Sequence, residues 1–481
     1  MPRVLAIAIA AALLSLLVVA PAPSYDPWAW LLWGRELAGG GLSTLDGPAF
    51  KPLPVAVCAL LAPLGTAAPW LWVALVRAAA LIAAWLAFGI ARRLAGGSRL
   101  VGALGAAGVL LCGALPAYTA AGAEPALVLV LALGGATAWR ERRMRFALAC
   151  AVGCALLRVE AWPFAVALGV VLWRSRPQDR ILLAALAVAL PAAWLVPELI
   201  GSGDLLRSGA RARVPNPGQP ALAGVPALAA LRDAAALPLW PLWGGVAALL
   251  WAERQRRSAR LGACAAGVDG FMRRQRRSGR AGAGTTGVDV STAALAPAAA
   301  GAAWIGIVAL MAQAGFSGEP RYALPGAALI ALSGAVGLAP VATSVTSTRL
   351  WPVEVTLVVA IAVAAGPRLA DLPALRAEQA YQWRLAEDLA TAVRAAGGPA
   401  AVLACGRPYV GPLRGPLMAY RIGVAKHRVE PDDPPRAPGI VFRSSLHPAA
   451  RPAPAAPPHF AEVARAGTWQ VLADCDVRAA A

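Results

Sequence analysis

Long apolar stretches separated by short arginine-rich segments are the feature that most restricts how this chain can fold. Each stretch is close to the roughly 20 residues that a helix needs to cross ~30 Å of hydrocarbon. The chain has 481 residues, of which 59% are hydrophobic and only 14% are charged. Soluble domains carry about 25% charged residues. We therefore predict an all-α polytopic membrane protein.

The apolar stretches predict eleven transmembrane helices. Residues 146–173 are divided into two short helices, because Arg158 and Glu160 interrupt them and both flanks are basic. Residues 52–64 are too short to cross and predict an interfacial or re-entrant helix. The other nine spans are predicted at 4–20, 70–91, 100–117, 122–139, 181–200, 236–252, 291–314, 322–340 and 350–366.

The arginines between spans predict the orientation, since Lys and Arg concentrate in cytoplasmic loops. The basic loop 253–290 and the N-terminus would be cytoplasmic, with the loop 22–69 outside. We divide the chain into a membrane domain, 1–366, and an extracytoplasmic tail, 367–481. The first stretch also fits a signal peptide, since Ala-Pro-Ala at 20–22 loosely resembles a cleavage site. High Ala, Arg, Gly and Pro usage is typical of a high-GC bacterium, so we predict the bacterial plasma membrane.

The net charge of +19 also suits nucleic-acid binding. The arginines lie mostly at span ends, however, so we predict no nucleic-acid partner. Within the basic loop, the sequence from Arg254 recurs from Arg274. A local duplication in a disordered loop is one interpretation, and binding to anionic lipid is the other.

The tail has the pattern of a small α/β domain. Leucines and valines at helical spacing over 372–393 predict a helix that ends at Gly397-Gly398. Short β-like runs follow at 401–404, 439–442 and 469–473. Cys405 and Cys475 each follow such a run, and they are candidates for a disulfide in an extracytoplasmic tail.

Charged residues near the membrane gather at the predicted outer tips of different helices. Such a gathering is what a site between helices requires. Carboxylates and cations are costly to place at the membrane and are functional candidates. These residues are Asp26, Glu36, Lys51, Glu124, Arg158, Glu160, Arg321 and the neighbouring Tyr322.

Each candidate also has a structural interpretation. Asp26 and Glu124 precede prolines, as helix N-caps do. Arg158 and Glu160 could neutralise one another. Arg321 could extend to the interface or pair with its neighbour Glu319. Against these, arginine suits bidentate contact with a phosphate.

Four motifs resemble those of the GT-C superfamily of polytopic glycosyltransferases, which includes the actinobacterial mannosyl- and arabinosyltransferases. They are Asp26-Pro-Trp-Ala-Trp, Lys51-Pro-Leu-Pro, Leu157-Arg-Val-Glu-Ala-Trp and Pro320-Arg-Tyr-Ala-Leu-Pro. The resemblance covers about residues 1–366 and leaves the tail outside. The acidic pair found in the first outer loop of the superfamily is absent, since proline follows Asp26.

The resemblance implies transfer of a sugar from a polyprenyl-phosphate donor to an acceptor hydroxyl of a cell-envelope glycan, lipid or protein. Asp26 would be the base, and Arg321 with Tyr322 would hold the donor phosphate. Glu124, Arg158, Glu160, Lys51 and Glu36 would contact substrate, and a divalent metal at Asp26 and Glu124 is possible. Two other classes stay open: a transporter or flippase using the same charged tips, and an envelope assembly protein acting through its tail.

Overall fold

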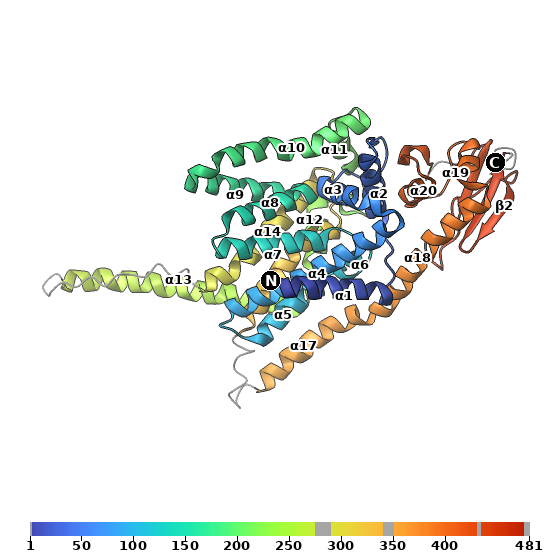
Figure 1. Cartoon of the computed structure of the whole chain (residues 1–481). Coiled ribbons are helices and arrows are strands. Elements are labelled where there is room, and N and C mark those ends of the chain that lie inside the picture. The colour runs from blue at the N-terminus through green and yellow to red at the C-terminus, as the bar shows by residue number, and fades with distance from the viewer. Residues whose placement is uncertain (1, 275–289, 340–350, 431–433, 476–481) are drawn as a thin grey trace.

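The computed structural model describes residues 2–274, 290–339, 351–430 and 434–475. These residues form a helical bundle that continues into a smaller tail with a three-stranded sheet (Figure 1). The principal bundle helices are α1 (Pro2–Val18), α2 (Tyr25–Ala38), α3 (Pro52–Leu61), α4 (Ala68–Leu94), α5 (Arg99–Leu110), α6 (Leu115–Ala120), α7 (Pro125–Arg140), α8 (Met144–Leu157), α9 (Trp162–Ser175), α10 (Arg180–Ser202), α11 (Arg207–Ala212), α12 (Pro226–Ala235), α13 (Trp240–Arg274), α14 (Val290–Gln313), α15 (Pro320–Gly337) and α17 (Trp351–Ala370).

Three helical segments of the described chain are long and apolar enough to cross a membrane: Pro52–Leu94, Pro177–Ser202 and Thr292–Gln313. A fourth arises if Pro226–Ala235 and Trp240–Ser258, bent by 97° at their junction, act together. Other predicted spans form shorter apolar helices. The 12 residues of α5, for example, extend only about 18 Å, less than the ~30 Å of a bilayer core. The predicted total of eleven spans therefore stays a prediction.

The predicted break at Arg158–Glu160 is confirmed. Helix α8 ends at Leu157, the short 3-10 helix η2 (Val159–Ala161) follows, and α9 starts at Trp162. Leu148 of α8 and Leu172 of α9 share one buried cluster, so the two helices form a hairpin.

One predicted span, 100–117, is wrong as a single helix. The chain turns between the end of α5 at Leu110 and the start of α6 at Leu115. Gly113 has a φ of +50° in this turn, and a Cβ there would lie 2.5 Å from a methyl carbon of Leu237. The turn thus needs glycine for both its backbone conformation and the close packing of Leu237.

Helices α2 and α3 lie unusually close together. A Cβ on Gly34 of α2 would lie 2.5 Å from the carbonyl carbon of Cys58 in α3. Helix α3 continues through the 3-10 segment η1 (Ala62–Ala67) and a break at Gly65 into α4. This is how the predicted short helix at 52–64 is built. The close approach sets where the start of α3, with Lys51, stands relative to the start of α2.

Buried Arg77 joins three helices. It lies within α4, yet its guanidinium donates to the carbonyl oxygens of Ser15 (3.1 Å) and Val19 (2.9 Å) at the end of α1, and of Ala120 (3.2 Å) at the end of α6. The last carbonyls of a helix lack partners within the helix. Arg77 supplies such partners and joins the C-terminal ends of α1 and α6 to α4.

The tail contains α18 (Leu372–Ala395), α19 (Gly398–Ala404), α20 (Gly415–Ile422), and strands β1 (Gly439–Arg443), β2 (Ala461–Ala466) and β3 (Trp469–Asp474). The sheet is antiparallel in the order β1-β3-β2, with Phe442 opposite Val471. The predicted strand at 401–404 is wrong, because this alanine-rich run after Pro399 favours a helix. Cys405 and Cys475 are bonded, with their Cα atoms 5.8 Å apart.

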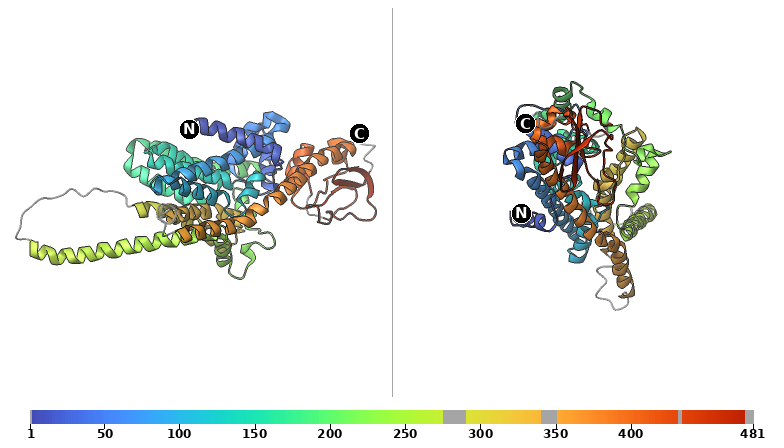
Figure 2. Two further views of the ribbon diagram at one scale, coloured as in Figure 1. Left: turned by 90° about the horizontal axis from the view of Figure 1, so that it is seen from below. Right: turned by 90° about the vertical axis from the view of Figure 1, so that its right-hand side faces the viewer.

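The tail and the C-terminal part of α13 lie at opposite ends of the molecule. Figure 1 and Figure 2 place the strands at the end of the bundle where α2 and α3 lie, whereas α13 extends away from the bundle at the far end. This arrangement suits the predicted topology. The second copy of the predicted repeat, after Arg274, falls largely outside the described residues.

We expect Arg77→Ala to lower the unfolding temperature of the detergent-solubilised protein by several degrees. The variant removes a donor from the buried carbonyl oxygen of Ala120, which costs about 1–3 kcal/mol, and from the partly buried carbonyls at the end of α1. Arg93→Ala, at the exposed end of the same helix, is the control. Equal unfolding temperatures for the two variants would contradict the assigned role of Arg77.

Candidate functional site

Asp26 forms an ion pair with Arg321. Its Oδ2 accepts a hydrogen bond from Arg321 Nη1 at 3.0 Å, across 295 residues of sequence. The N-cap interpretation of Asp26 is wrong, because Ser24 holds that position and Asp26 lies in the first turn of α2. A carboxylate there is still favoured by the helix dipole. Its side chain is thus free to point at α15 instead of capping its own helix.

Arg321 is held by several groups at the start of α15. Besides Asp26, its Nε forms a close ion pair with Glu319, and its Nη2 donates to the Tyr322 hydroxyl at 3.2 Å. The predicted local pair with Glu319 is therefore present together with the long-range one. One arginine thus contacts two carboxylates, and it can exchange one of them for another anion without becoming unpaired.

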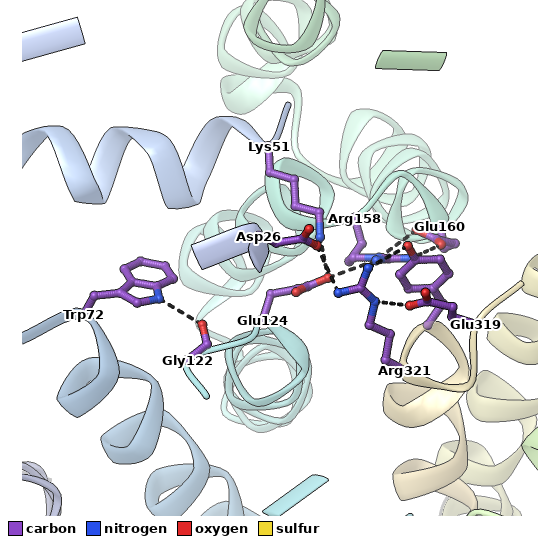
Figure 3. A network of polar contacts seen from close by, with 10 residues as sticks. Asp26, Lys51, Trp72, Gly122, Glu124, Arg158, Glu160, Glu319 and Arg321 are labelled. Carbon is purple, nitrogen blue, oxygen red and sulfur yellow. Dashed lines mark hydrogen bonds and ion pairs between the residues drawn. The ribbon is translucent and has the colours of Figure 1, made fainter. Parts of the chain in front are cut away.

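Glu124 lies at the centre of a second, fully buried network (Figure 3). It occupies the N-cap position of α7 but makes no capping hydrogen bond with its side chain. Instead its Oε1 accepts from Lys51 Nζ at 2.5 Å and from Arg158 Nη1 at 3.0 Å. Arg158 Nε also donates to Glu160 at 3.1 Å. The network therefore joins α3, α7 and the hairpin tip between α8 and α9.

The two networks meet at Tyr322. The guanidinium carbon of Arg158 lies 3.7 Å from the centre of the Tyr322 ring, and that of Arg321 lies 5.0 Å from it. Lys51 stacks in the same way on Trp30 of α2, at 5.0 Å. Cations placed over aromatic faces are stabilised electrostatically. The predicted residues Asp26, Lys51, Glu124, Arg158, Glu160, Arg321 and Tyr322 are thus brought into one continuous cluster.

The electrostatics of Glu124 follow from its neighbours. Burial disfavours an unpaired carboxylate, but Lys51 and Arg158 each place a cationic nitrogen within 3.0 Å of Oε1 and stabilise the charged form. Glu124 is therefore ionised. Its second oxygen, Oε2, is buried and has no hydrogen-bond partner within the described chain. A buried oxygen of this kind is suited to accept a hydrogen bond from a bound molecule.

A cavity of about 270 Å³ borders the cluster. Its wall includes Lys51, Arg158, Glu160 and Tyr322, and aromatic and aliphatic side chains such as Trp162 and Trp194 complete it. A site between helices predicts that Asp26, Glu124, Glu160 and Arg321 converge on one cavity. Of these four residues, Glu160 lines this cavity, and Asp26, Glu124 and Arg321 do not. Asp26 and Arg321 are turned toward each other, and Arg321 contacts the wall residue Tyr322.

Glu36 does not join the cluster. It lies about 15 Å along α2 from Asp26, at 1.5 Å per residue. There its Oε2 accepts a hydrogen bond from the backbone of Ser43 at 2.9 Å. Burial raises the pKa of Glu36, against the effects of this hydrogen bond and of Arg35. Its observed contacts shape the loop after α2.

Sequence reasoning missed one polar group beside the cavity and another beside the charged cluster. Glu198 of α10 is completely buried and bonds closely to the hydroxyl of Ser208, which accepts from the backbone NH of Phe50 at 2.6 Å. A lone carboxylate at the end of an apolar span was the signal that could have found it. Tyr118 of α6 lies close enough to Arg321 and Glu124 to interact electrostatically with both. No local pattern marks that tyrosine.

A metal centre receives no geometric support. Within the described ranges, no group of three or more His, Cys, Asp and Glu side chains is arranged to hold a metal ion. The two carboxylates considered for a metal, Asp26 and Glu124, each contact a cationic side chain.

Comparison with known proteins gives structural matches only. No family model matches the sequence, and no curated protein matches it. The fold is similar to the crystal structure of ArnT from Cupriavidus metallidurans bound to undecaprenyl phosphate, with a TM-score of 0.47, 14% identity, and 99% of this chain and 98% of that chain covered. The apo structure of the same protein gives a TM-score of 0.49 and 16% identity over 98% and 97%.

We expect Arg158→Met to be strongly destabilising, by about 3–5 kcal/mol, because it leaves the buried carboxylates of Glu160 and Glu124 short of a cation. Thermal unfolding in detergent measures the effect. Adding Glu160→Gln should restore part of the loss, since one uncompensated charge is then removed. Arg174→Met, at the exposed opposite end of α9, is the matched control. Equal stability of Arg158→Met and the control would contradict the network.

Proposed function

We propose that this protein is a membrane glycosyltransferase that moves a sugar from a polyprenyl-phosphate donor to an acceptor hydroxyl at the extracytoplasmic face. The observation that carries the proposal is the 3.0 Å contact between Asp26 and Arg321, beside a buried charged cluster and a cavity. This contact brings together a candidate base and a side chain that could bind phosphate. The four sequence motifs that resemble the GT-C superfamily contribute the charged residues of this cluster apart from Glu124.

The proposed reaction needs one carboxylate. Asp26 accepts the proton of the acceptor hydroxyl, and the hydroxyl oxygen attacks the anomeric carbon of the donor sugar. The bond between that carbon and the phosphate oxygen breaks, and the bonding electrons leave with the lipid phosphate. Phosphate is a good leaving group, so no second carboxylate has to protonate it, unlike in glycoside hydrolysis. Attack opposite the leaving group inverts the anomeric configuration.

An exchange of partners on Arg321 would connect donor binding to base activation. In the free protein, the guanidinium neutralises Asp26 and Glu319. A donor phosphate competes for the same guanidinium, which can bind phosphate oxygens in pairs. When Arg321 turns to the phosphate, the Asp26 carboxylate is released from its ion pair and can accept a hydrogen bond from the acceptor hydroxyl. Glu319 remains beside Arg321, so the arginine stays in place during the exchange.

The second network would supply a rigid polar wall. Lys51, Arg158 and Glu160 border the cavity and are fixed by ion pairs to buried Glu124 or to each other. Side chains held in this way can present donors and acceptors to sugar hydroxyls without reorganising on binding. In this proposal the network contacts the substrate, and Asp26 accepts the proton.

We expect Asp26→Asn to lower kcat for transfer by about 10²–10⁴-fold, the usual contribution of a positioned general base. Arg321→Lys should instead raise KM for the donor, because a lysine loses the bidentate contact. The assay uses purified protein with labelled polyprenyl-phosphate hexoses and pentoses. Glu141→Gln, an exposed carboxylate between α7 and α8, is the control and should transfer at the wild-type rate.

Undiminished transfer by Asp26→Asn would remove Asp26 as the base while leaving the enzyme class intact. Absence of transfer from every donor of the panel would instead favour the transporter or assembly-protein alternatives.

A further inference from the structure

A second cavity, of about 560 Å³, lies where the tail meets the bundle. Its wall is built from α2, η1 and the start of α4 on one side, and from α18 and α20 of the tail on the other. This volume is within the ~300–1,000 Å³ typical of small-molecule sites. The cavity does not share its lining with the cavity beside the charged cluster. Figure 1 shows α20 next to α2, at the end of the bundle that we predict to be extracytoplasmic.

Aromatic rings dominate the wall. Trp28 and Trp70 come from the bundle, and Trp383 and Tyr420 come from the tail. Trp70 and Trp383 meet edge to face with their ring centres 5.6 Å apart, and Trp70 is 47% exposed. Trp28 and Tyr420 meet at 5.3 Å and are already covered by Arg421 and Arg35. The rings still available to a ligand are therefore those of Trp70 and Trp383.

The arginines of this cavity have hydrogen-bond partners within the protein. Arg35 donates to the carbonyl oxygen of Tyr420 at 2.7 Å, and Arg421 donates to Glu387 at 2.7 Å. An anion site would offer guanidinium groups without such partners, and a site for a quaternary ammonium would offer several open ring faces. What the cavity offers instead is a carboxylate–guanidinium pair beside two tryptophans. Arg421 Nε is buried and has no hydrogen-bond partner within the described chain.

We propose that this cavity binds a neutral saccharide chain. One face of a sugar ring carries C–H groups that pack on a tryptophan, while its edge carries hydroxyls that donate and accept hydrogen bonds. The exposed ring of Trp70 and the partly buried ring of Trp383 suit the C–H face. Arg421 and Glu387 provide a donor and an acceptor for the hydroxyls, and such charge-assisted hydrogen bonds are strong.

The inference goes beyond the proposed transfer reaction and does not depend on it. Trp28 and Asp26 lie on the same helix, but Trp28 contacts the tail, whereas Asp26 contacts α15. A saccharide held here would be bound by the tail and the bundle together. The tail would thus act as half of a glycan-binding site and not only as a cover for α2.

Isothermal titration of the full-length protein with cellohexaose, mannohexaose and arabinohexaose tests the inference. The protein is purified in a detergent without a sugar headgroup, because a maltoside would compete. We expect at least one oligosaccharide to bind, and Trp70→Ala and Trp383→Ala each to weaken that binding by about tenfold or more. Trp383→Phe should retain part of the affinity. Trp85→Ala, which removes a comparably exposed tryptophan (41%) from α4, should bind as wild type.

Three results would overturn the inference. The first is that no oligosaccharide binds at millimolar concentration. The second is that binding is unchanged in the Trp70→Ala, Trp383→Ala double variant. The third is that inorganic phosphate binds in place of the sugars and is lost with Arg421→Met. Circular dichroism and gel filtration of each variant separate loss of binding from loss of fold. Asp26→Asn should bind the oligosaccharide as the wild-type protein does. A failed transfer assay would therefore not count against oligosaccharide binding.

Discussion

The structure depends on burying charge at one end of an apolar bundle. Glu124 is 1% exposed, and Arg158 and Lys51 are almost as buried, so each must keep its partner or lose several kcal/mol. Their ion pairs require the starts of α3 and α7 and the tip of the α8–α9 hairpin to converge. The Asp26–Arg321 pair adds α2 and α15 to the same junction. The relative positions of these five helical segments therefore follow from the need to pair buried charges. The apolar lengths of the helices determine only that they reach into the membrane.

The tail packs against α2, the helix that carries Asp26. One buried cluster runs without interruption from Trp30 and Trp33 of α2 into Leu385, Met418 and Trp469 of the tail. Polar contacts strengthen the same junction, since buried Lys426 pairs with Asp46 and His427 meets the hydroxyl of Ser43 at 2.9 Å. The helix that carries Asp26 thus packs against the tail and also forms an ion pair with α15. The cavity at the tail is lined by Trp28 and Arg35 of that helix.

Local patterns predicted most helices and the hairpin break, because apolar length and basic flanks are encoded within single segments. These local patterns failed where packing between distant segments determines the structure. The turn at Gly113 follows from the contact with Leu237, and the role of Asp26 follows from Arg321, 295 residues away. The residue types of the cluster could be predicted, since charges at predicted outer tips are few. Which of them pair, and that Glu36 stands apart from them, could not be predicted because pairing depends on how helices cross.

The account rests on Arg321 exchanging Asp26 for a donor phosphate. A cryo-electron microscopy structure of the protein with bound polyprenyl phosphate tests this exchange most directly. We predict that the phosphate lies within hydrogen-bond distance of the Arg321 guanidinium, and that the Asp26 carboxylate has left its 3.0 Å contact and faces the cavity. A phosphate bound elsewhere, with the Asp26–Arg321 pair intact, would contradict the account.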